Sequence, residues 1–202
     1  TSDTVYYYPI TYTISYNANG GSGAPASQTK KYDVDITITT SKPTRTGYTF
    51  IGWSRSASSS TLAYSSGDRY TANASATLYA VWSAKKYTIS YDANGGTGAP
   101  ASQTKIYGLK MTLSSTKPTR SGYTFKGWGT TSTATSAFYQ PGDSYSANSN
   151  RTLYAVWEQN APTTYTVSYN ANGGNGAPGS QTKTHNVALT LSSTKPTRNG
   201  YT

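Results

Sequence analysis

The sequence predicts an all-β protein built from small modules in tandem, with little or no helix. Two observations support this prediction. The motif Y-T-[IV]-S-Y-x-A-N-G-G-x-G-A-P begins at Tyr12 and returns at Tyr87 and Tyr165, and self-similarity at a fixed period is typical of a tandem array. No stretch of about ten residues or more has helical periodicity, whereas short stretches of alternating apolar and polar residues recur throughout.

The copies are in tight register. Trp53 and Trp128 are 75 residues apart (128 − 53), and Trp82 and Trp157 have the same spacing (157 − 82), so the first two copies align without a gap. The third copy starts 78 residues after the second (165 − 87). The organisation we expect is an N-terminal strand or linker (1–11), a first module (12–82), a linker (83–86), a second module (87–157), a linker (158–164) and the first half of a third module (165–202).

The first strand of the module is Tyr12 to Tyr16, in which Tyr12, Ile14 and Tyr16 share one face. Residues 17–23 follow as a loop, because their Asn-Gly and Gly-Gly pairs permit positive φ. A second strand is expected around residues 27–32. Each of these features returns in the later copies, so we expect one fold to be repeated.

The next segment alternates apolar and polar residues, with Val34, Ile36 and Ile38 on one side. The later copies change the residue type but keep the apolar character, which is what packing in a core permits. We therefore expect this face to lie in the core, with the counterparts Leu109, Met111 and Leu113 in the second copy and Val187, Leu189 and Leu191 in the third.

The second half of the module is expected to contain two more strands. Residues 42–48 are predicted to form a turn, since proline is excluded from the interior of helices and central strands. The strand 48–53 follows, then an exposed Ser/Thr-rich loop at 54–61 and a turn at 64–70. Residues 77–82 have bulky groups on both faces, which favours a central strand.

Three sequence blocks in this order resemble a known family. They are the opening motif, then K-P-T-R-x-G-Y-T-F-x-G-W, then T-L-Y-A-V-W. This combination resembles the internalin-type B repeat, also called the Listeria-Bacteroides repeat, over 12–82 and 87–157 in full and over 165–202 in part. The resemblance implies a β-grasp-like module found in tandem on large secreted or wall-anchored bacterial surface proteins. It supplies no binding residues that can be carried over.

The end of the chain interrupts the third copy. It stops at Tyr201-Thr202, where the first two copies continue into Phe-x-Gly-Trp. Half a module cannot close the same core, so we expect this chain to be a piece of a longer protein.

Composition favours an extracellular location. The chain has no cysteine, one histidine, seven acidic residues and a formal net charge of +10. Lack of cysteine excludes disulfides and thiolate metal sites, and abundant Tyr, Thr, Ser, Gly and Asn is typical of a β-rich extracellular protein. The charge suits acidic partners such as host or wall glycans and polyanions. Because the basic residues are scattered, solubility of a long array is the simpler interpretation, and we expect neither specific nucleic-acid binding nor membrane insertion in this segment.

Catalysis is not expected, and neither is a cofactor. The histidine, His185, stands where the first two copies have Tyr32 and Tyr107, so neither complete copy contains a histidine-dependent nucleophile.

The acidic residues also argue against chemistry in the module. Asp33 and Asp35 have no acidic counterparts in the second copy, and the one recurring acid is Asp68, repeated as Asp143. One carboxylate per module cannot supply both a general acid and a base, nor the several oxygens of a calcium site. We expect Asp68 and Asp143 to cap a Gly-Asp turn.

Aromatic residues form both glycan-binding platforms and β cores. Those in register across the copies are interpreted as structural: Tyr16, Tyr48, Phe50, Trp53, Tyr79 and Trp82. The candidates for contact with a ligand or partner are the less regular ones: Tyr6, Tyr7, Tyr8, Phe138 and Tyr139.

An internal Lys-Asn isopeptide crosslink is an open alternative for a surface protein without disulfides. A lysine and an asparagine recur in every copy, but no buried acid stands out to assist the reaction. The recurring residues are Lys30, Lys105 and Lys183, with Asn19, Asn94 and Asn172.

Three functions remain open at this stage, and all place the chain on the bacterial cell surface or in the medium. The first is a mechanical stalk, spacer or fibre segment of an adhesin, supported by the short linker 83–86 between neighbouring repeats. The second is a glycan- or mucin-binding module that gains avidity from repetition. The third is homo-assembly into a filament, in which residues 4–8 add a strand to a neighbour's sheet.

Overall fold

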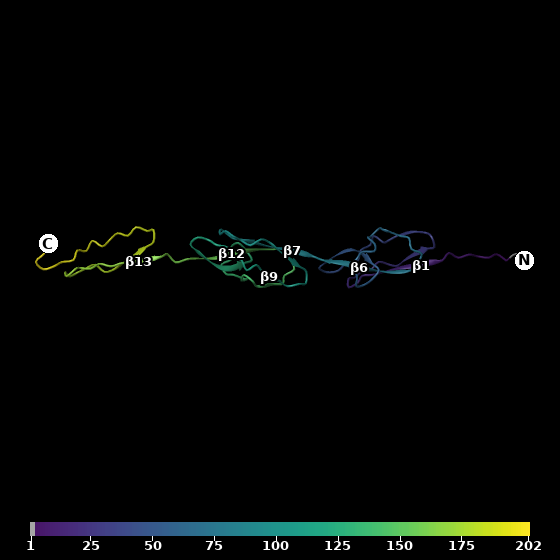
Figure 1. The fold of residues 1–202 in the computed structure, drawn as a ribbon, viewed down its shortest axis with the longest axis horizontal. Helices are drawn as coiled ribbons and strands as arrows, with labels where there is room; N and C mark the ends of the chain where they lie inside the picture. Colours follow the sequence, from purple (N-terminus) through teal and green to yellow (C-terminus); the bar gives the residue numbers. More distant parts are fainter. Residues whose placement is uncertain (1–2) are drawn as a thin grey trace.

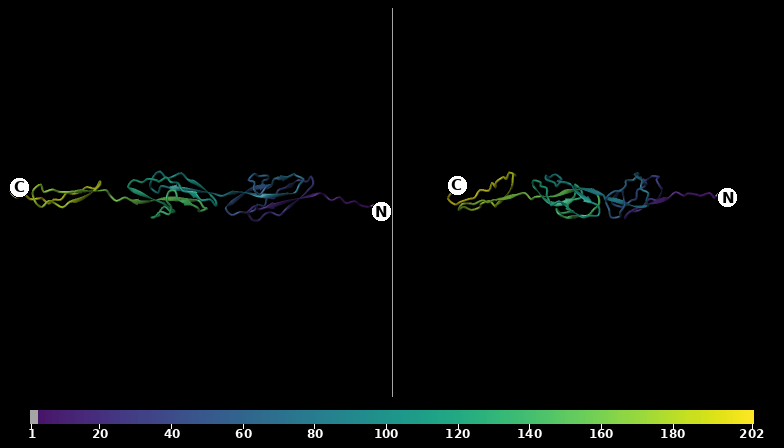
Figure 2. Two further views of the ribbon diagram at one scale, coloured as in Figure 1. Left: turned by 60° about the horizontal axis from the view of Figure 1, so that its bottom comes forward. Right: turned by 45° about the vertical axis from the view of Figure 1, so that its right-hand side comes forward.

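A computed structural model describes residues 3–202. The molecule is elongated, with its two ends at opposite extremes of the long axis (Figures 1 and 2). Two four-stranded sheets follow one another along the chain, and a two-stranded hairpin comes last. We call residues 11–84 module 1, residues 86–159 module 2 and residues 164–202 the C-terminal hairpin segment. No helix occurs in residues 3–202, so the predicted all-β class is confirmed.

Module 1 is a mixed sheet in the order β2-β1-β6-β4. The pair β1 and β6 in the middle is parallel, and the two outer pairs are antiparallel. A separate two-stranded ribbon of β3 and β5 stands beside it. The strands are β1 Thr11–Asn17, β2 Gln28–Lys31, β3 Ile36–Thr37, β4 Tyr48–Ser54, β5 Arg69–Tyr70 and β6 Ala76–Ala84. The strand predicted to be central, β6, therefore lies between β1 and β4.

Module 2 repeats this arrangement. Its sheet has the order β10-β12-β7-β8 with a parallel pair β7 and β12, and β9 pairs with β11. The strands are β7 Lys86–Asp92, β8 Gln103–Ile106, β9 Met111–Thr112, β10 Tyr123–Gly129, β11 Ser144–Tyr145 and β12 Arg151–Gln159. The β-grasp-like label that the family resemblance implies stays a prediction.

The core of module 1 is built around Trp53, which has no exposed surface. The rings of Tyr16 and Phe50 pack against it with centroid distances of 4.8 and 4.9 Å. Ile14 and Leu78, on the two parallel strands, are also fully buried. Module 2 has the same cluster around Trp128. Of the in-register aromatic residues, Tyr16, Phe50, Trp53 and Trp82 thus belong to the core or pack against it, as predicted, whereas Tyr48 and Tyr79 lie outside this cluster.

A bulge in β4 brings Trp53 onto the core. The pairing with β6 shifts between Phe50 and Gly52, and Gly52 has a φ of 149°. A Cβ on Gly52 would lie 2.9 Å from the carbonyl oxygen of Tyr64. This close approach explains why glycine precedes tryptophan in both complete copies.

The segment after β2 is expected to turn Val34, Ile36 and Ile38 toward the core, and this prediction is wrong for Val34. Ile38 is fully buried, but Val34 is 54% exposed and its counterpart Leu109 is 61% exposed. The reason is a turn between β2 and β3, in which Asp33 has a φ of 52° and Val34 N–H donates to Lys31 O. Val34 therefore belongs to the turn, and only Ile36 and Ile38 face the core.

The two ends of the described chain are simpler. Of the two expectations for residues 1–11, a strand or a linker, the strand is not seen over residues 3–10, and residues 1–2 lie outside the described range. The C-terminal hairpin segment pairs β13 Thr164–Val167 with β14 Gln181–Thr184. Leu191 is 59% exposed, whereas its counterpart Leu113 in module 2 is 1% exposed.

Candidate functional site

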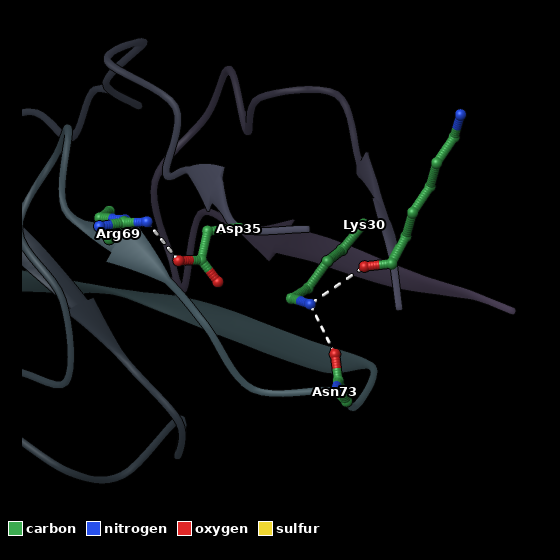
Figure 3. Close-up of polar contacts among 5 residues, drawn as sticks. Lys30, Asp35, Arg69 and Asn73 are labelled. Atoms are coloured by element: carbon green, nitrogen blue, oxygen red, sulfur yellow. Dashed lines mark hydrogen bonds and ion pairs between the residues drawn. The ribbon is translucent and has the colours of Figure 1, made fainter. Parts of the chain in front are cut away.

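A buried lysine is the most unusual polar feature of each complete module. Lys30 on β2 has no exposed surface, although lysine is almost never fully buried unless it is paired. Its Nζ donates to Asn73 Oδ1 at 2.7 Å and to the carbonyl oxygen of Lys31 at 3.1 Å (Figure 3). Such bonds offset the cost of removing an ammonium group from water. A Tyr12 ring lies 5.8 Å from Nζ and adds a cation–π contact.

Module 2 repeats the arrangement. Lys105 is also fully buried, and its Nζ donates to Asn148 Oδ1 at 2.9 Å and to Ile106 O at 2.7 Å. In the C-terminal hairpin segment Lys183 Nζ donates to Thr184 O at 2.7 Å. All three lysines donate to the carbonyl of the next residue, whereas full burial and the bond to an asparagine are shared by the two complete modules.

The acids around this lysine are found in module 1 alone. Asn73 Nδ2 donates to Asp33 Oδ1 at 2.6 Å, and Asp33 N–H donates to Asn73 Oδ1 at 3.0 Å. Nearby, Arg69 pairs with Asp35 at 2.5 Å (Figure 3). In module 2, Gly108 N–H still donates to the asparagine Oδ1, at 3.1 Å, but no carboxylate stands there. The backbone contact recurs and the carboxylate does not, which indicates that the asparagine organises a turn in both modules.

The asparagine that meets the lysine is not the expected one. Asn19 lies in the loop after β1, where its Nδ2 donates to the carbonyl oxygens of Ala57 and Ala80, both at 3.0 Å. The sequence did contain the correct signal, because Asn73 returns as Asn148 at the module spacing of 75 residues (148 − 73).

The junction between the two modules is a single residue. Lys85 follows β6 and precedes β7, and both of its backbone groups are held: its N–H donates to Gly47 O at 2.9 Å, and its carbonyl accepts from Tyr107 N–H at 2.9 Å. The Tyr107 ring lies directly on Gly47, where a Cβ would be 2.1 Å from the ring. It also meets the ring of Tyr48 edge-on, at 5.6 Å between centroids. Modules 1 and 2 are therefore joined by backbone and side-chain contacts together.

The second junction is looser. Here the two backbone bonds are made by different residues of the linker. Asn160 N–H donates to Gly122 O at 2.9 Å, whereas the carbonyl that accepts from His185 N–H, at 2.8 Å, belongs to Thr163, three residues further along the chain. Apart from its two chain neighbours, no residue has an atom within 4 Å of where a Cβ on Gly122 would be, so no ring of another module covers this glycine. His185 instead contacts Tyr165, with 3.2 Å between Nδ1 and the hydroxyl oxygen. A thin connection is visible between β12 and β13 in Figure 1.

The predicted contact residues lie in two places. Tyr6, Tyr7 and Tyr8 are 75%, 91% and 87% exposed, and Phe138 is 70% exposed. Tyr139 is half-buried and packs on the core of module 2, with its ring 5.5 Å from that of Tyr145. Tyr139 is the counterpart of Tyr64, a recurrence that marks a packing role. The structure does not bring the two sets together, and their contact role stays a prediction.

The acids that recur do cap a turn, as expected. Asp68 Oδ2 accepts from Ser65 N–H at 2.6 Å, and Asp143 Oδ2 accepts from Gln140 N–H at 2.7 Å. Within residues 3–202, no three side chains of His, Asp or Glu gather as a metal site would require.

Comparison with known proteins accounts for the repetition. The model of the Listeria-Bacteroides repeat domain matches residues 12–81, 87–156 and 165–202. The chain belongs to the Listeria-Bacteroides repeat family. This family is a non-catalytic repeat domain typical of bacterial surface proteins.

Two relatives from Evansella cellulosilytica carry similar sequence. One, named "Putative Gly-rich membrane protein", is 31% identical over 189 residues, which are 86% of this chain and 21% of that protein. The other, named "Putative membrane protein", is 33% identical over 153 residues, which are 74% of this chain and 22% of that protein. The chain thus spans about one fifth of the length of the curated relatives it matches. The part of the chain that the structure describes contains no helix long and apolar enough to cross a membrane.

Proposed function

We propose that this chain is a non-enzymatic stalk segment of a bacterial cell-surface or secreted protein, in which a row of β modules holds another domain at a distance. The observation that supports this function is the junction at Lys85. A stalk can hold a distal domain at a fixed distance only if consecutive modules resist bending relative to each other. A single linking residue with both backbone groups bonded leaves little freedom at that point.

The Tyr107 contact adds energy to this constraint. Burying an aromatic ring stabilises by about 1.5 to 3 kcal/mol, and an edge-on aromatic pair adds about 0.5 to 1.5 kcal/mol. Tyr107 is half-buried, so we take about 2 kcal/mol for the docked arrangement over a bent one. This corresponds to a preference of about thirtyfold for the docked arrangement.

Distance measurements between spin labels test the proposal. The chain has no cysteine, so single labels can be placed at exposed positions such as Ser60 and Thr135, one in each module. We expect a narrow distance distribution across the first junction. A pair at Thr135 and Ser193, across the second junction, should give a broader one, because Pro162 and its neighbours are not held in the same way.

A matched pair of variants isolates the ring. Tyr107→Ala should broaden the distribution across the first junction. Tyr32→Ala removes the corresponding tyrosine from module 1, where it is 53% exposed, and should leave that distribution unchanged. A broad distribution in the unaltered chain, or equal effects of the two variants, would overturn the stalk proposal.

A further inference from the structure

Three arginines occupy the same unusual setting. Arg45, Arg120 and Arg198 close the K-P-T-R sequence of each copy. Each guanidinium lies over the ring of the tyrosine three residues later, with Cζ 4.1, 3.9 and 4.5 Å from the ring centroid. Cation–π stacking of this kind fixes the plane of the guanidinium.

The opposite face of each guanidinium lies against a glycine. Cζ of Arg45 would be 3.5 Å from a Cβ on Gly20, and the same distance is 3.4 Å for Arg120 with Gly95. A Cβ at this distance would make an ordinary van der Waals contact, so the reason for glycine here is its positive φ, 83° at Gly20 and 86° at Gly95. We call this arrangement of loop glycine, arginine and tyrosine the arginine cradle.

The guanidinium groups in the cradles have no bonding partner among residues 3–202. Arg55, by contrast, donates to the Tyr64 hydroxyl at 2.6 Å, and Arg69 pairs with Asp35 at 2.5 Å. A guanidinium carries five N–H donors in its plane. The tyrosine ring covers one face of that plane and the loop glycine borders the other, so the edge is free to donate.

The free edge borders an open polar cleft. In module 1 the cleft has a volume of about 570 Å³ and is lined by Gly20, Gly21, Ser22, Thr44, Arg45 and Thr46. In the C-terminal hairpin segment a cleft of about 420 Å³ also borders Arg198, but it lies on the side of Ala171, Lys195 and Tyr201 and does not include the loop glycines. Hydroxyl groups and a fixed guanidinium in one cleft match the oxygens of an anion.

We propose that each arginine cradle binds one sulfate, phosphate or carboxylate group of an extended acidic polymer. A single surface ion pair contributes at most about 1 kcal/mol. Stacking improves on this because the arginine is already ordered before binding. Three cradles on one chain multiply the effect, since the second and third contacts become intramolecular. This proposal does not rest on the stalk function, because the cradles would bind whether or not the junctions bend.

Binding to immobilised polymers, measured over a range of salt concentrations, tests the cradles. The probes are heparin, poly(glycerol phosphate) and polygalacturonate, which carry mainly sulfate, phosphate and carboxylate groups. In the cradle variant all three arginines are changed to glutamine. In the control variant Arg69, Lys110 and Arg151 are changed to glutamine, which removes the same charge from exposed positions outside the cradles.

We expect the cradle variant to lose on the order of a hundredfold in affinity, and the control variant far less. The slope of log affinity against log salt should fall by about 2 to 3 in the cradle variant. A preference for poly(glycerol phosphate) would assign a wall polymer, and a preference for heparin a sulfated glycan. Equal losses in the two variants, or no binding to any probe, would overturn the proposal.

A charge-conserving variant tests whether net charge alone explains binding, and its folding is checked separately. Changing the three cradle arginines to lysine keeps the net charge but removes the planar fork. Circular dichroism and thermal unfolding must match those of the unaltered chain. Affinity should still fall markedly in this variant, and full affinity with lysine would show that net charge alone accounts for binding.

Discussion

Asn73 should contribute more to the stability of module 1 than its position on an exposed loop suggests. The change Asn73→Ala removes the 2.7 Å acceptor of the buried Lys30 ammonium and the 3.0 Å acceptor of Asp33 N–H. A hydrogen bond to a charged group is worth about 1.5 to 3 kcal/mol, and a neutral one about 1 kcal/mol. Because Asn73 is exposed, water can replace part of the hydrogen bonding that the alanine variant loses. We therefore expect a loss of about 2 kcal/mol or more in unfolding free energy.

Hydrogen exchange followed by mass spectrometry on the whole chain measures this loss. A change of about 2 kcal/mol accelerates globally controlled exchange about thirtyfold. Peptides from module 1 should show that acceleration, and peptides from module 2 should not, so the second module is an internal reference. Equal acceleration in both modules would refute a local role for Asn73.

Two further variants identify which bond matters. Asp33→Gly introduces the residue that module 2 has at this position. Because Asp33 has a φ of 52°, glycine should be tolerated there with no loss of stability. Lys30→Met removes the charge, and in that background Asn73→Ala should cost at least about 1 kcal/mol less. Additive losses, or a larger loss from Asp33→Gly than from Asn73→Ala, would show that the lysine contact is not the source of the stability.

Two other predictions concern groups in the same module. Burial raises the pKa of Tyr16, while the bond from Thr39 N–H lowers it by less. The protonated hydroxyl of Tyr16 therefore contributes its full stabilisation below a pH of about 10, and this stabilisation is lost as the pH rises through the folded-state pKa. Denaturant midpoints should fall at alkaline pH, and less steeply in Tyr16→Phe; parallel curves would contradict this assignment. The intact mass of the chain should equal that of its sequence, because the Lys30 and Asn73 contact recurs in module 2 without a carboxylate. Loss of one ammonia would show an isopeptide bond.

Strand positions could be predicted because their signals are local. Alternation and tight turns define β1 and β4, and bulky residues on both faces of β6 indicate a central position. The exposed Val34 could not be placed in this way, because the turn at Asp33 shifts the alternation. In that turn Asp33 N–H donates to Asn73 Oδ1, which is 40 residues away. A contact between distant loops is invisible to a periodicity argument.

The candidate sites show the same limit. Lysine is ordinarily an exposed residue, so nothing in the Q-T-K sequence around Lys30 indicates burial. The lysine recurs in each copy, but the asparagine that recurs in the opening motif, Asn19, lies in the loop after β1 and does not contact it. The roles of Tyr107 and Lys85 also lay outside the prediction. They depend on how two modules meet, whereas the repeat describes one module at a time.

The arginine cradle and the first junction share a residue. Tyr48 supports Arg45 through its ring face, at 4.1 Å, and meets Tyr107 edge-on. Docking of module 2 therefore restrains the ring that orients the guanidinium. The cradle of Arg120 has no such support, because no ring covers Gly122 at the second junction. Within one chain, the number of residues between two modules thus decides whether a ring docks on the junction glycine and whether that docking also restrains the tyrosine of the cradle.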